Sequence, residues 1–131
     1  MSILVSFPGG VKVDAQIEGF VVATDQPVRA GGEGSAPAPF GLFLASLATC
    51  AGYYVKAFCD SRDISTEGIS VTMDTEYNPA EKMIGKFIIR IHVPADFPEK
   101  YDAAVVNAAA ICAVKRHLSE KIVHEIVVVR P

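Results

Sequence analysis

Alternating apolar and polar positions at the start of the chain predict three short strands. The alternation is weak over Ser2–Phe7 and clear over Val11–Ile17, and the turn sequence Pro8-Gly9-Gly10 separates the two. This pattern is typical of a β-hairpin. A second turn at Glu18-Gly19 leads to a third expected strand over Phe20–Thr24.

The next segment, Asp25–Pro39, is predicted to be a loop because glycine and proline interrupt it throughout. These residues are Pro27, Gly31, Gly32, Gly34, Pro37 and Pro39. The segment is longer than most links between elements, which favours a functional loop over a passive connection.

A long apolar helix is expected after this loop. It begins near Ala38 or Pro39, since proline is tolerated in a first helical turn, and it ends near Ser61–Ile64. Within it, the 16 residues Phe40–Val55 carry no charge. A membrane span needs about 20 apolar residues, so we predict a helix buried in a protein core. Because one small domain must cover every face of this helix, the run also indicates a sheet on one side and a second chain on the other.

The second half of the chain predicts another hairpin and two helices. The alternating segments Glu67–Asn78 and Met83–Val93 are the expected strands. Helices are predicted over Pro98–Ala110 and Ala113–Glu120, and a last strand over Ile122–Val129. The resulting order, β-β-β-α-β-β-α-α-β, contains no repeated βαβ unit, which favours an α+β fold.

Composition narrows the class of protein. With 131 residues the chain suffices for one domain, 1–131, and is too short for two. An apolar fraction of 50% excludes a disordered chain, and three cysteines are too few for a small disulfide-bonded scaffold. The net charge of −3 predicts no nucleic-acid partner. The first residues, MSILVSFPGG, lack the features of a signal peptide, so we expect a cytoplasmic, reduced protein.

The three cysteines are the most reactive side chains and differ in setting. Cys50 and Cys59 lie nine positions apart on the long helix, which places them on opposite faces. Cys112 precedes the predicted start of a helix and the basic run Lys115–His117, a setting that stabilises a thiolate. Each cysteine alone also fits ordinary core packing, because buried thiols behave as small hydrophobic groups.

Two segments resemble the OsmC/Ohr family, the osmotically inducible protein C and organic hydroperoxide resistance proteins. The first runs from Gly31 to Cys50 and reads GGEGSAPAPFGLFLASLATC. The second runs from Ile111 to Leu118 and reads ICAVKRHL, where the family usually has Cys-Pro-Val before a helix. The predicted order of elements is similar to that family over nearly the whole chain.

The resemblance implies a thiol peroxidase. Cys50 would attack an organic hydroperoxide and become a sulfenic acid, and Cys112 would condense with it to a disulfide that an external dithiol reduces. The resemblance also implies an intertwined homodimer in which the long helix is buried. From the sequence itself we expect neither a metal nor a bound cofactor, and no membrane partner.

The sequence departs from the family pattern near the expected site. Active peroxidases of the family have a glutamate before the first cysteine, where this chain reads Pro39-Phe40-Gly41. Glu33 is a candidate replacement, and Arg29 is the only N-terminal candidate for the family's arginine; the alternative for Arg29 is a solvated loop charge. These departures leave a second hypothesis, a non-catalytic module that binds an apolar or thiol-reactive small molecule at the dimer interface.

Aromatic residues near Cys50 are candidates for a substrate pocket or for packing at the dimer core. They are Phe40, Phe43, Tyr53 and Tyr54. The three histidines, His92, His117 and His124, are too far apart for a recognised metal motif. The run Gly31-Gly32-x-Gly34 lacks the strand and helix that frame a dinucleotide-binding loop, so it predicts no cofactor.

Overall fold

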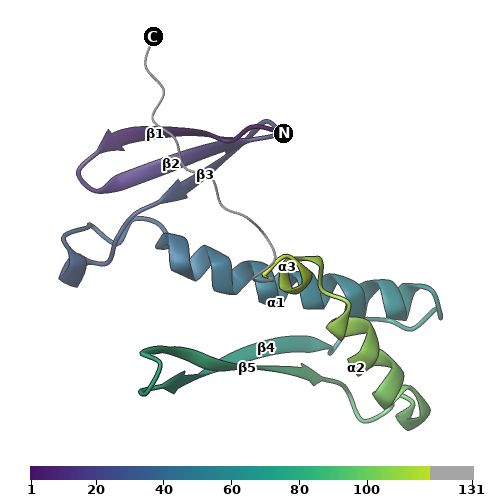
Figure 1. Cartoon of the computed structure of the whole chain (residues 1–131). Helices are drawn as coiled ribbons and strands as arrows, with labels where there is room; N and C mark the ends of the chain where they lie inside the picture. The colour runs from purple at the N-terminus through teal and green to yellow at the C-terminus, as the bar shows by residue number, and fades with distance from the viewer. Residues whose placement is uncertain (119–131) are drawn as a thin grey trace. The chain divides into compact units, whose positions relative to one another are not determined.

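The computed structural model describes residues 1–118 and has the expected α+β composition (Figure 1). The strands are β1 (Leu4–Gly9), β2 (Lys12–Ile17), β3 (Phe20–Thr24), β4 (Ser70–Asn78) and β5 (Met83–His92). The helices are α1 (Pro39–Asp60), α2 (Asp102–Ala110) and α3 (Ala113–Arg116), with 3₁₀ turns at Val28–Ala30 and Glu99–Tyr101. The strand predicted over Ile122–Val129 and the end of the helix predicted over Ala113–Glu120 lie outside the described residues.

The chain divides into two compact units, Met1–Ala45 and Ser46–Pro131. The first holds β1, β2, β3, the following loop and the first residues of α1. The second holds the rest of α1, the β4–β5 hairpin, α2 and α3. The prediction of a single domain over 1–131 stays a prediction.

The first unit is an antiparallel three-stranded sheet in the order β1-β2-β3. The pairing of β1 with β2 is irregular between Ser6 and Gly9, so β1 extends into the predicted turn, and Gly10 with φ 57° makes the reversal. The sheet buries little: among residues 1–45 only Thr24 and Asp25 are buried. Large apolar side chains therefore stay exposed in this unit, with Phe7 at 80%.

A buried carboxylate organises the loop after β3. Asp25 is 1% exposed and accepts hydrogen bonds from the backbone N–H of Gln26 (2.8 Å), Glu33 (3.1 Å) and Ser35 (3.1 Å), and from the Ser35 hydroxyl (2.8 Å). These donors, those of Ser35 first, lower the pKa of the carboxyl from 3.8 to about 2. Gly32 lies so close that a Cβ there would sit 1.9 Å from the Gln26 carbonyl oxygen. The loop is thus a folded element.

The second unit is built on one stripe of α1. Its buried residues recur at helical spacing and are Leu47, Ala51, Val55, Phe58 and Cys59. They form a core with Phe97 and with Val105 and Ala109 of α2, against partly buried side chains of β4 and β5 such as Val71 and Ile91. Figure 1 shows the hairpin running beside this part of α1, with α2 near its end.

The helix α1 begins at Pro39, as predicted, and ends at Asp60, one residue before the predicted range. One chain alone does not cover it all round, because Tyr53 is 65% exposed. Its 22 residues are long and apolar enough to cross a membrane by length and composition, a property that core helices of soluble proteins share. The charge-free run Phe40–Val55 is shorter than the helix itself, so its length does not exclude a membrane-spanning helix. The absence of a membrane partner stays a prediction.

The segment after β5 positions Cys112. The predicted helix Pro98–Ala110 opens instead with the 3₁₀ turn Glu99–Tyr101, and α2 starts only at Asp102. At its other end Ile111 leaves the helical region, with φ −79° and ψ 57°, so the chain turns there before α3. Cys112 therefore sits at the corner between two helices.

Candidate functional site

Cys50 and Cys112 are brought together from separate elements. Cys50 lies on α1 and is half-buried, whereas Cys112 precedes α3 and is 7% exposed. The two thiols are hydrogen-bonded side chain to side chain. All three cysteines fall within residues 1–118 and none forms a disulfide there. Cys50 and Cys112 are therefore the two thiols in contact from which a disulfide would form.

Backbone amides at the start of α3 also donate hydrogen bonds to Cys50. The Val114 N–H contributes most, followed by the Cys112 thiol and then the Ala113 N–H, and together they lower the pKa of Cys50 although burial opposes them. The sequence predicts stabilisation of a thiolate at Cys112 instead. In the structure the first amides of α3 donate to the Cys50 sulfur, while the Cys112 carbonyl accepts from the Arg116 N–H (3.0 Å) as part of the helix.

Cys59 has the opposite environment. It is fully buried in the core of the second unit, and burial raises the pKa of its thiol, with Asp60 adding to the effect. This placement follows from the spacing of Cys50 and Cys59 on one helix. Nothing in its surroundings favours a thiolate as strongly as the donors at Cys50 do.

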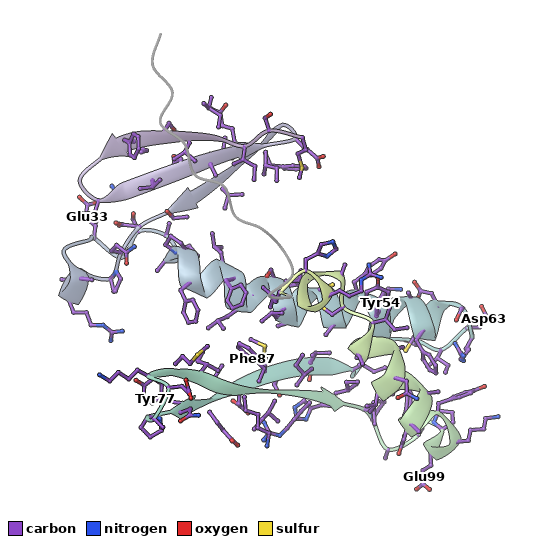
Figure 2. All side chains as sticks on the ribbon, in the orientation of Figure 1. Glu33, Tyr54, Asp63, Tyr77, Phe87 and Glu99 are labelled. Atoms are coloured by element: carbon purple, nitrogen blue, oxygen red, sulfur yellow. The ribbon has the colours of Figure 1, made fainter. Side chains whose placement is uncertain are left out.

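An apolar groove of about 380 Å³ leads to Cys112. We name it the Cys112 groove after its lining residues, which include Leu47, Phe87, Ile89, Ala110, Cys112 and Leu118. Figure 2 shows Phe87 on β5, on the side of the hairpin that faces α1. A second groove of about 420 Å³ shares Phe87, Ile89 and Ala110 with the first and extends along α2 as far as Asp102.

The groove residues on β5 escaped sequence reasoning. The alternation of Phe87, Ile89 and Ile91 predicted an apolar strand face. Nothing in the sequence indicates that Phe87 and Ile89 stay more than a third exposed and line a groove with Cys112. Only the packing of elements that are far apart in the sequence brings these two side chains into one groove with Cys112.

The predicted aromatic residues form two separate pairs. Phe40 and Phe43, in the first unit, stack with ring centroids 5.6 Å apart. Tyr53 and Tyr54, in the second unit, meet edge to face at 5.3 Å and are not among the residues that line the Cys112 groove. A substrate-binding role for these four side chains stays a prediction.

The charged candidates Arg29 and Glu33 both belong to the first unit. Arg29 lies in the 3₁₀ turn Val28–Ala30. The Glu33 carboxylate pairs with Lys12 at 2.7 Å, which raises the pKa of Lys12, and its backbone N–H donates to Asp25. Neither residue is among the groups that act on the pKa of Cys50.

Within residues 1–118, no cluster of three or more histidine, cysteine or acidic side chains is placed to hold a metal ion. His92 hydrogen-bonds Thr72 across the hairpin (2.8 Å), and His117 hydrogen-bonds the Ala113 carbonyl of its own turn (2.6 Å). His124 lies outside the described residues.

Comparison with known proteins gives a family match over most of the chain. The family model described as OsmC-like protein matches residues 32–127. No curated protein sequence matches the chain.

Solved structures match the fold at low sequence identity. A protein from Psychrobacter arcticus 273-4, provisionally described as an osmotic stress induced and detoxification response protein, is similar with a TM-score of 0.75 and 20% identity, over 92% of this chain and 89% of that one. An organic hydroperoxide resistance protein OsmC from Legionella pneumophila has a TM-score of 0.56 and 22% identity, covering 92% and 90%. The organic hydroperoxide resistance protein OhrB of Bacillus subtilis has a TM-score of 0.52 and 17% identity, covering 92% and 93%.

Proposed function

Because this chain belongs to the OsmC-like protein family, we propose that it reduces organic hydroperoxides through a thiol cycle at Cys50 and Cys112. The observation that carries the proposal is the contact between these two thiols, with the amides of Ala113 and Val114 donating to the Cys50 sulfur. The names of the Legionella and Bacillus proteins support a role in resistance to organic hydroperoxides.

The first step uses Cys50 as the nucleophile. Hydrogen bonds to its sulfur favour the thiolate, which is the reactive form. The thiolate attacks the terminal oxygen of the hydroperoxide, the O–O bond breaks, and the alkoxide takes up a proton to leave as the alcohol. Cys50 is thereby oxidised to a sulfenic acid.

The second step uses Cys112 as the resolving thiol. Its sulfur attacks the Cys50 sulfenic acid, water leaves, and a Cys50–Cys112 disulfide forms. An external dithiol then returns both cysteines to thiols and is itself oxidised to a disulfide. No bound cofactor takes part in this cycle.

Activation of Cys50 in this proposal relies mainly on neutral donors. The groups that lower its pKa are two backbone amides and one thiol, with no charged side chain among them. A role for Arg29 at the site stays a prediction. The chain thus works without the glutamate that the family pattern has before the first cysteine.

We further propose that the protein is a cytoplasmic homodimer that binds neither nucleic acid nor membranes. Apolar surface supports the dimer: Phe40 and Tyr53 of α1 are 57% and 65% exposed, and Phe7 and Phe20 of the first sheet are 80% and 72% exposed. Large apolar side chains are commonly buried in folded proteins, and a partner would cover these.

The test is a titration of the reduced protein with cumene hydroperoxide, followed by thiol counting and peptide mapping. We expect loss of two thiols per chain and a disulfide that joins Cys50 to Cys112. The Cys59→Ser variant is the control and should behave as the native chain does, whereas Cys50→Ser should consume no peroxide. Unchanged thiols after excess peroxide would refute the proposed reaction.

The apolar lining of the Cys112 groove favours a second candidate, a module that binds an apolar small molecule without turnover. Mass spectrometry of the purified intact protein distinguishes the two. A retained adduct, together with full ligand affinity in Cys50→Ser, would support binding, and a loss of two hydrogens on oxidation would support the peroxidase.

A further inference from the structure

We propose that the thiol that reduces the Cys50–Cys112 disulfide attacks the sulfur of Cys112 and expels Cys50. The proposal rests on the proposed function, because that function supplies the disulfide. It adds the direction of the exchange and the face from which the reductant approaches. Two independent observations carry it: the position of the Cys112 groove and the position of the hydrogen-bond donors.

The groove gives access to one of the two sulfurs. Cys112 lines it, and Cys50 is not among its lining residues. The groove has a volume of about 380 Å³, and Phe87 and Ala110 line both this groove and the second one along α2. Cys50 is half-buried and Cys112 is 7% exposed, so exposure does not favour Cys112, and the groove supplies only a path of approach to its sulfur.

The donors decide which sulfur leaves. In an exchange, the sulfur that is not attacked takes up negative charge, and a sulfur that holds this charge more easily leaves faster. The N–H groups of Ala113 and Val114 already donate to the Cys50 sulfur in the reduced protein. They are therefore in place when charge develops on Cys50, and donors fixed before the reaction stabilise such charge best. Attack at Cys50 would instead develop charge on Cys112.

The exchange balances in two steps. A reductant thiolate forms a bond to the Cys112 sulfur, the Cys50–Cys112 bond breaks, and Cys50 departs as a thiolate. The second thiol of the reductant then attacks the reductant sulfur of this mixed disulfide, Cys112 leaves and takes up a proton, and the reductant ends as a disulfide. Two electrons pass from the dithiol to the two cysteines.

A monothiol stops the exchange after the first step and so records its direction. The full chain is oxidised with diamide, which takes two hydrogens from the thiols, and is then freed of the reagent. Benzyl mercaptan is added, and samples are quenched at short times with N-ethylmaleimide. Trypsin places Cys50 and Cys112 on separate peptides, because Lys56 and Lys100 lie between them. The ratio of the Cys112 adduct to the Cys50 adduct is extrapolated to zero time, so that later migration of the benzylthio group between the two sulfurs does not affect it.

We expect the benzylthio group on Cys112 and the maleimide on Cys50, with an excess on the order of tenfold over the reverse pattern. A benzylthio group mainly on Cys50, or an equal distribution at zero time, would overturn the proposal. Failure of diamide to join the two cysteines would overturn both this proposal and the proposed function. If diamide joins them and hydroperoxide does not, the proposed function alone fails.

A pair of variants on α2 tests the approach through the groove. Ala110 is exposed and lines the Cys112 groove, whereas Ala103 is exposed on the same helix and is not among the lining residues. The Ala110→Phe variant should slow formation of the Cys112 adduct several-fold, and Ala103→Phe should leave its rate unchanged. Equal rates in both variants would overturn the assigned approach, and thermal melting of each verifies that it folds.

Discussion

The acidity of Cys50 depends on atoms that belong to another element. Its partners are the Cys112 thiol and the amides of Ala113 and Val114, which follow it by more than sixty positions in the sequence. The sequence identified Cys50 and Cys112 through their flanking segments, and it identified a helix start near Cys112. It could not show which sulfur the amides of that helix start would face, because this depends on where α1 passes the start of α3.

Removing the donor at residue 112 should raise the pKa of Cys50. In Cys112→Ala one hydrogen bond to the Cys50 thiolate is lost, so the midpoint of the alkylation rate against pH should move to higher pH. Cys112→Ser retains a hydroxyl donor and is the matched control, with a smaller shift expected. The measurement is the rate of iodoacetamide modification of Cys50 from pH 5 to 10, and identical profiles for Ala and Ser would contradict the role of the donor.

Asp25 should make folding stability depend on pH at the acidic end. Its carboxyl pKa is lower in the folded chain, at about 2, than its usual value of 3.8. Since the folded state favours the ionised form, the stability that Asp25 contributes is complete above about pH 5 and is lost as the pH falls towards 2. The Asp25→Asn variant should therefore melt at a lower temperature than the native chain at pH 7.

The same difference in melting temperature should shrink near pH 2, where Asp25 of the native chain also becomes protonated. Circular dichroism melting curves at pH 7 and pH 2.5 measure this. Ser6→Ala, on the exposed part of β1, is the control and should match the native chain at both values. A difference in melting temperature that is the same at both pH values would contradict the hydrogen-bond network assigned to Asp25.

At the scale of elements, apolar periodicity predicted the described helices and strands to within a few residues. The start of α1 at Pro39 followed from the tolerance of proline in a first turn, and both hairpins followed from alternation. The 3₁₀ turn Glu99–Tyr101 was missed because proline and acidic residues are typical of either helix type at its start. The Asp25 network was also missed, since its partners are spread over ten residues of a loop that composition marks only as irregular.

Two positions on α1 should respond differently to truncation. Phe58 is 7% exposed, packs edge to face on Tyr101 at 5.7 Å, and lies under the Arg62 guanidinium at 3.7 Å. Phe58→Ala should lower the free energy of unfolding by about 3–5 kcal/mol. Tyr53→Ala, at a 65% exposed position of the same helix, should change the stability of the isolated chain by less than about 0.5 kcal/mol. Urea unfolding at low protein concentration measures both.

At the scale of the whole molecule, the distribution of apolar surface predicts a dimer. The first unit buries only Thr24 and Asp25 among residues 1–45, so its sheet lacks a core of its own within the described chain. The sequence supplied the same expectation from the charge-free run Phe40–Val55, which one small domain cannot cover. The arrangement of the two copies cannot be derived from one chain. Apolar periodicity indicates which face of an element is covered, and it does not indicate which surface covers it.

Light scattering should give twice the chain mass of 14.0 kDa at micromolar concentration. In Phe20→Asp, a charge replaces a 72% exposed aromatic side chain of the first sheet, and the dimer should weaken at least tenfold if a partner covers that face. Lys82→Gln in the turn between β4 and β5 changes the net charge by the same single unit at an exposed polar site and is the control. A native monomer at these concentrations would contradict the prediction.

The donors at Cys50 have a consequence for how the site tolerates change over evolution. Two of the three are main-chain N–H groups, which every residue except proline supplies, so replacing the side chains of Ala113 or Val114 leaves them in place. The family commonly has proline directly after the second cysteine, and at that position this chain has Ala113, whose N–H reaches the sulfur. Alanine at residue 113 thus supplies a donor that proline at this position could not supply, and this donor does not depend on any charged side chain.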